Sequence, residues 1–139
     1  MSRTVAVLAA AAALALGACG SSEEDQARDD VCDARADIER QVNELKELTP
    51  STATVDQVRE NVEAIGNDLR KIGEAQGQLS DERRSEIQAA NQALTAELRE
   101  IGSTILRSTS VEEARAQLEA AVTQLGASYS NTLAKFDCG

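Results

Sequence analysis

The chain has 139 residues and a formal net charge of −10, so it can form one domain with a strongly acidic surface. Such a surface repels the phosphates of nucleic acids and the headgroups of anionic lipids, which makes both poor binding partners. Histidine is absent, which removes the commonest general base and the commonest metal ligand, so we expect a non-enzymatic protein without a cofactor or metal.

The first eighteen residues have the pattern of an export signal. Arg3 supplies a positive charge, and an apolar run from Val5 to Leu16 follows it. This run is shorter than the roughly 18–20 apolar residues that span a bilayer. The pattern therefore predicts a cleaved signal peptide over residues 1–18 and not a transmembrane helix.

The end of this run, Leu16-Gly17-Ala18-Cys19, resembles the lipobox of bacterial lipoproteins. The resemblance implies that the lipoprotein signal peptidase recognises Leu16, Gly17 and Ala18. Cleavage then occurs before Cys19, and the thiol of Cys19 carries a diacylglyceryl group. Because two acyl chains anchor a protein stably, we expect an extracytoplasmic protein attached to the bacterial cell membrane. The alternative is ordinary secretion after cleavage at Ala15, which leaves three cysteines and one without a partner.

The residues that follow Cys19 lack apolar side chains as far as Gln26. We therefore expect residues 19–27 to be the lipidated cysteine and a flexible acidic tether, and residues 28–139 to be the folded domain.

Apolar residues recur at steps of three and four throughout this domain, and strand-type alternation is absent. The pattern predicts an all-α domain with helices at about 28–48, 54–76, 80–107 and 110–137. Pro50 ends the first helix. Capping boxes at 54–57 and 110–113 open the second and fourth, and Ser80 is the expected N-cap of the third.

Cys32 and Cys138 lie near the two ends of this helical region. In an up-down bundle they share one end only if the number of helices is even, and a disulfide needs α-carbons roughly 4.4–6.8 Å apart. We therefore predict an antiparallel up-down four-helix bundle with coiled-coil-like packing, closed by a Cys32–Cys138 disulfide. The alternatives are an intermolecular disulfide or two free thiols. If the helix were continuous through 76–80 or 107–110, the bundle would have an odd number of helices and the two cysteines would lie at opposite ends.

Acidic residues cluster at the start of the first helix. Asp29, Asp33 and Asp37 are four residues apart, with Asp30 beside them, so a helix stacks three carboxylates on one face. Ca²⁺ takes oxygen ligands, but a straight helix spaces these carboxylates too widely to enclose an ion. Acids also favour the first turns of a helix by themselves. We interpret the cluster as a solvated face.

The sequence favours a membrane-anchored helical module of the cell envelope that acts in protein interaction or as a spacer, with an unspecified envelope protein as partner. The alternative is a lipoprotein that binds a small apolar ligand between its helices. An inward-facing cluster of Asn91, Gln92 and Thr95 beside a cavity would favour that alternative.

Gly66 and Gly73 either let a neighbouring helix approach closely or are tolerated at the surface. Abundant alanine, and arginine in preference to lysine, are typical of high-GC bacteria such as actinobacteria.

Overall fold

The computed structural model describes residues 22–48, 54–108 and 111–139, and all regular structure in these ranges is helical. The elements are α1 (Glu23–Leu48), α2 (Val55–Ala75), η1 (Gln76–Gln78), α3 (Asp81–Arg107), α4 (Val111–Asn131) and η2 (Leu133–Lys135), where η denotes a 3₁₀ helix. The predicted all-α fold with four long helices is confirmed for this part of the chain. The predicted signal peptide, the lipobox, Pro50 and Ser110 lie outside the described residues.

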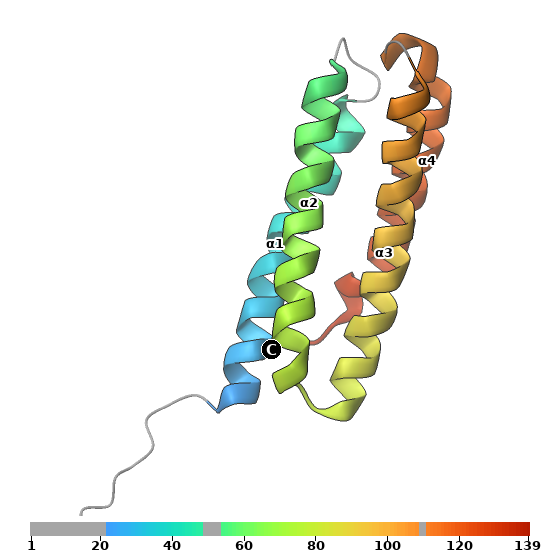
Figure 1. The fold of residues 1–139 in the computed structure, drawn as a ribbon. Helices are drawn as coiled ribbons and strands as arrows, with labels where there is room; N and C mark the ends of the chain where they lie inside the picture. The colour runs from blue at the N-terminus through green and yellow to red at the C-terminus, as the bar shows by residue number, and fades with distance from the viewer. Residues whose placement is uncertain (1–21, 49–53, 109–110) are drawn as a thin grey trace, which may run out of the picture.

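The four long helices lie side by side, with α1 next to α2 and α3 next to α4 (Figure 1). α2 also packs on α3, and α1 packs on α4, so the contacts close into a ring around one core. The helix η1 contacts α1, α2 and α3 at one end of the molecule, and η2 packs on α3 and α4. Of the two, only η2 contributes a buried side chain, Leu133, to the core.

The core consists mainly of the aliphatic residues that repeat at helical spacing. Its largest fully buried side chains are Val31, Ile38, Val42 and Leu45 of α1, Ile65 and Ile72 of α2, Ile87, Leu94 and Ile101 of α3, Leu118 and Leu125 of α4, and Leu133 of η2. The only tyrosine, Tyr129, and the only phenylalanine, Phe136, are buried with them. Each fully buried aliphatic side chain stabilises the fold by roughly 1.5–3 kcal/mol.

The start of α2 has the predicted capping box. The backbone N–H of Gln57 donates to Thr54 Oγ1 at 3.2 Å, and the backbone N–H of Thr54 donates to Gln57 Oε1 at 2.8 Å. At the start of α3, Ser80 occupies the N-cap position, but its side chain makes no capping hydrogen bond. The predicted N-cap position is therefore confirmed, without a side-chain cap, and the backbone N–H of Ser80 donates to Glu24 Oε1 of α1 at 3.4 Å.

The first helix begins at Glu23, so the prediction of a flexible tether through residue 27 is wrong over its second half. Glu23, Glu24 and Asp25 form the first turn, where carboxylates interact favourably with the helix dipole. Ser22 Oγ accepts the backbone N–H of Asp25 at 3.1 Å, and Ala27 is buried against the core. The folded domain therefore begins about five residues before the predicted boundary.

The fourth helix ends at Asn131 and not at 137 as predicted. Thr132 leaves the helical conformation, η2 makes one turn, and Phe136 is extended with φ −61° and ψ 131°. This change of direction buries Leu133 and Phe136 and brings Cys138 to α1. A straight helix satisfies the apolar spacing equally well, so the spacing alone does not reveal the turn.

Candidate functional site

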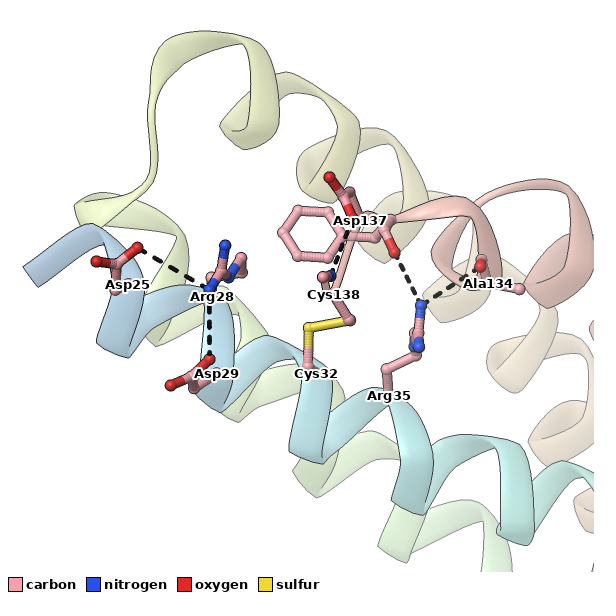
Figure 2. The surroundings of a disulfide bond; sticks show 10 residues. Asp25, Arg28, Asp29, Cys32, Arg35, Ala134, Asp137 and Cys138 are labelled. Carbon is pink, nitrogen blue, oxygen red and sulfur yellow. Dashed lines mark hydrogen bonds and ion pairs between the residues drawn. A yellow bond between two sulfur atoms is a disulfide. The ribbon is translucent and has the colours of Figure 1, made fainter. Parts of the chain in front are cut away.

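A disulfide joins the C-terminal segment to α1. Cys32 and Cys138 are bonded with their α-carbons 5.8 Å apart and 106 positions apart in sequence (Figure 2). The predicted intramolecular pairing is confirmed, and neither sulfur is a free thiol in this state. Both residues are partly buried against the core. The bond therefore acts as a structural link between the first helix and the last residues of the chain.

Arg35 strengthens the same connection by binding the backbone beyond α4. Its Nη1 donates to the carbonyl oxygen of Phe136 at 2.8 Å and to that of Ala134 at 3.4 Å (Figure 2). These carbonyls have left the helical hydrogen-bond ladder, so a cationic donor satisfies them. The sequence alone does not distinguish Arg35 from the other solvent-exposed charged residues of this acidic helix. The turn at Thr132 is what brings the carbonyl oxygens of Ala134 and Phe136 within reach of its guanidinium.

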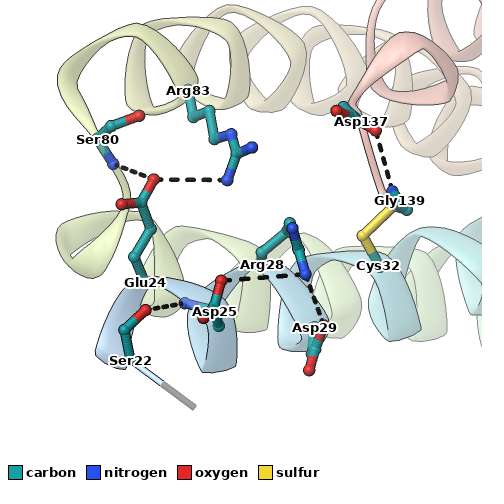
Figure 3. A network of polar contacts seen from close by, with 11 residues as sticks. Ser22, Glu24, Asp25, Arg28, Asp29, Cys32, Ser80, Arg83, Asp137 and Gly139 are labelled. Carbon is teal, nitrogen blue, oxygen red and sulfur yellow. Dashed lines mark hydrogen bonds and ion pairs between the residues drawn. A yellow bond between two sulfur atoms is a disulfide. The ribbon is translucent and has the colours of Figure 1, made fainter.

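A second polar network fastens the first turn of α1 to the start of α3. Glu24 Oε1 accepts from the backbone N–H of Ser80 and from Arg83 Nη1, each at 3.4 Å (Figure 3). Arg28 lies 4.0 Å from Asp25 and 3.9 Å from Asp29 on the same helix. Each of these partly exposed ion pairs contributes little by itself. The two contacts of Glu24 with Ser80 and Arg83 join the acidic first turn of α1 to the folded domain.

The aspartates of the acidic cluster on α1 do not enclose a common point. Asp29 is exposed beside Arg28, whereas Asp37 binds Arg40 at 2.9 Å. Asp30, Asp33 and Asp37 line a groove between α1 and α2. Within residues 22–48, 54–108 and 111–139, no group of three or more His, Cys, Asp or Glu side chains could hold a metal ion.

Asp68 is a buried carboxylate that the sequence interpretation missed. Its side chain lies between α2 and α1, where it accepts from Gln41 Nε2 at 3.0 Å and from Lys71 Nζ at 2.9 Å. The hydrogen bond from Lys71 and the charge of Asp68 raise the pKa of Lys71 above its usual value. The signal is present in the sequence, because Asp68 follows Ile65 by three residues and precedes Ile72 by four, which places all three on one face.

Tyr129 also carries a polar group into the core. Burial of the ring is the largest cause that raises the pKa of its phenol. The negative charge of Glu39 raises this pKa further, whereas the positive charge of Arg35 lowers it. The phenol of α4 therefore lies in the electrostatic environment of Glu39 and Arg35 of α1, and burial holds its proton more tightly than in the unfolded chain.

An open groove follows the boundary between α2 and α3. It consists of two adjoining depressions that share Asn91 and Thr95. The other residues of the first are Gln76, Gln88, Gln92 and Arg99, and those of the second are Gly66, Leu69, Arg70, Gly73 and Glu74 of α2. Asn91, Gln92 and Thr95, which would favour the ligand-binding alternative if they faced inward beside a cavity, lie close together, with Asn91 and Thr95 half-buried and Gln92 exposed. The groove is a polar surface feature and not the apolar cavity that a site between the helices requires.

The two α2 glycines of this groove behave differently. A Cβ placed on Gly66 would meet no atom within 4 Å, so the interpretation that a helix approaches closely is wrong there. A Cβ on Gly73 would lie 3.3 Å from Asn91 Nδ2. Gly73 therefore admits the Asn91 side chain, whose amide donates to the carbonyl oxygen of Leu69 at 3.3 Å.

No family model matches the sequence, and no curated protein and no solved structure is significantly similar to it. Across the described helices, none combines the length and the apolar character needed to cross a membrane.

Proposed function

We propose that this protein is an extracytoplasmic lipoprotein, anchored to the bacterial cell membrane through a diacylglyceryl group on Cys19, whose folded part is a non-enzymatic interaction or spacer module of the cell envelope. The observation that carries the proposal is Leu16-Gly17-Ala18-Cys19 at the end of a short apolar run. Signal peptidase cleavage before Cys19 would leave this residue as the first of the mature chain.

The disulfide supports this assignment. The chain has three cysteines, and Cys32 and Cys138 are paired, so Cys19 is the remaining one. Disulfides form and persist in oxidising, extracytoplasmic compartments, where an unused cysteine is uncommon. Attachment of a lipid gives Cys19 a chemical role that is compatible with the pairing of the other two.

We also infer an antiparallel up-down order for the four helices. The ring of contacts between successive helices, with α4 returning to α1, supports this order. The pairing of Cys32, near the start of α1, with Cys138, after the end of α4, supports it as well. In this arrangement the disulfide, the Arg35 contacts and the Glu24 network lie at the end nearest to Cys19.

The anchor and the fold together define a spacer geometry. Four residue steps separate Cys19 from Glu23, and such a segment spans at most about 14 Å when fully extended. The 27 residues of α3 form a helix about 40 Å long. The disulfide end of the domain would thus be held close to the membrane, with the opposite end presented about 40 Å farther away.

Metabolic labelling with a clickable fatty acid in a bacterial host tests the anchor. We expect the wild-type chain to take up the label and Cys19→Ser to lose it. Cys138→Ser is the matched control, since it removes a cysteine of the disulfide and should leave labelling intact. Label that persists in Cys19→Ser, or that is missing from the wild type, contradicts the proposal.

A further inference from the structure

The beginning of α1 is attached to the domain more weakly than the rest of this helix. Its N-terminal segment, residues 23–31, precedes Cys32 and buries two side chains, Ala27 and Val31. Ala27 removes little apolar surface from water, so Val31 is the first sizeable core residue of the helix. The side chains that α1 buries after Cys32 are Ala34, Ile38, Val42 and Leu45. Most of the apolar packing of α1 therefore lies beyond the disulfide.

An open groove of about 580 Å³ lies between the N-terminal segment and α2. Glu23, Gln26 and Asp30 of the segment line this groove and are exposed. The lining on the other side comes from Lys71, Glu74 and Ala75 of α2 and Gln78 of η1. The segment thus packs on α2 through few apolar groups, which is typical of regions that open locally while the rest of a protein stays folded.

One side chain supplies the polar attachment of the N-terminal segment. Within the described part of the chain, Glu24 is the only side chain of residues 23–31 that forms a hydrogen bond or ion pair with another element (Figure 3). Its contacts with Ser80 and Arg83 are each 3.4 Å long, and the Glu24 side chain is 41% exposed. Such partly exposed contacts contribute little stability, so a small force or a thermal fluctuation can break them.

The disulfide marks the end of this weakly held segment. Cys32 directly follows it and is bonded to Cys138, near the end of the chain (Figure 2). A pull on the N-terminus that unwinds α1 therefore reaches a covalent bond at Cys32. To unwind α1 further, the pull must also detach the C-terminal segment, which the Arg35 contacts and the buried Phe136 hold in place. Unwinding of α1 from its N-terminus is thus limited at Cys32.

We propose that the N-terminal segment of α1 is an extensible part of the membrane tether, which unwinds when the anchored end is pulled, and that the Cys32–Cys138 disulfide limits the extension. The nine residues gain about 17 Å when helix becomes extended chain. The spacer then has two lengths, while the rest of the domain stays folded. This inference deepens the proposed function and rests on it, because a chain without an anchor carries no tension.

Force spectroscopy of the full chain tests the proposal. A peptide tag at each end joins the oxidised protein to two beads by enzymatic ligation, so no added thiol disturbs the disulfide. The bond bypasses residues 33–137, which therefore carry no load. We expect a reversible step of about 17 Å from the N-terminal segment. The step should occur at a lower force than the unfolding of Cys32→Ala/Cys138→Ala, in which the same pull acts on the whole domain.

Glu24→Gln identifies the contact that holds the segment closed. The substitution removes the ion pair with Arg83, so we expect the opening equilibrium to shift about threefold toward the extended form. Glu23→Gln is the matched control, because it removes an exposed carboxylate from the same helical turn without breaking a contact to another element. We expect it to open like the wild type.

Three results would overturn the proposal. They are the absence of a step below the unfolding force of the double cysteine variant, a step that differs clearly from about 17 Å, and equal shifts for Glu24→Gln and Glu23→Gln. The tags take the place of the lipid in this experiment. A failure of the extensible segment and a failure of fatty-acid labelling at Cys19 are therefore distinguishable.

Discussion

The carboxylate of Asp68 is a charged group inside the contact between α1 and α2. Its oxygens bind Gln41 and Lys71, and the side chain of Asp68 is only 5% exposed. Buried carboxylates are tolerated when both oxygens have donors, and they then fix the register of the elements that they join. We interpret Asp68 as the group that sets how α1 and α2 align.

Asp68→Ala should lower the free energy of unfolding by about 1–3 kcal/mol, because the Gln41 amide loses its partner inside the contact. Urea denaturation followed by circular dichroism measures the change. Asp56→Ala is the matched control, since Asp56 also pairs with a basic residue three positions away but is 79% exposed. Equal losses for the two variants would contradict a special role for Asp68.

Tyr129 gives the protein a predictable response to alkaline pH. The folded protein holds the phenolic proton more tightly than the unfolded chain, whose tyrosine titrates near 10.0. The stabilisation is therefore complete below that pH and is lost as the pH rises through the pKa of the folded state. Because Tyr129 is the only tyrosine, the ultraviolet absorbance of tyrosinate reports this group alone. We expect a midpoint above 10.0, and a midpoint at or below that value would show that the ring is solvated.

At the scale of whole elements, the bodies of the helices could be predicted and two of their ends could not. Apolar residues at steps of three and four locate all four helices, and local hydrogen bonds fix the capping box at Thr54. The start of α1 depends in part on Glu24, which binds residues more than fifty positions away. The end of α4 depends on Arg35 and Cys32 of α1. Contacts this distant leave no local pattern in the sequence.

The link between α1 and the C-terminal segment should dominate the stability of the domain. The double variant Cys32→Ala/Cys138→Ala removes a bond between residues 106 positions apart and should lower the free energy of unfolding by about 4–5 kcal/mol. Guanidinium denaturation under non-reducing conditions measures this loss. Cys19→Ala serves as the control and should unfold like the wild type. Coincident unfolding curves for the double variant and the wild type would show that the bond does not hold the fold.

At the scale of the molecule, the number of cysteines bears both on the proposed attachment to the membrane and on the disulfide that closes the fold. Three cysteines predict one pair and one remaining residue: the Cys32–Cys138 pair is present in the fold, and the lipid on Cys19 stays a prediction. The α2–α3 groove is only partly predictable. The spacing of Asn91 and Thr95 places them on one face, but the open space around Gly66 and the close contact of Asn91 with Gly73 depend on where α3 passes α2.

Top-down mass spectrometry of the protein extracted from bacterial membranes tests the central claim most directly, because one spectrum reports the first residue, its modification and the cysteine pairing. We predict a chain that begins at Cys19 with a diacylglyceryl group on that residue, and a Cys32–Cys138 bond that lacks the two thiol hydrogens. A mature chain that begins at Leu16, or an unmodified Cys19, would contradict the account.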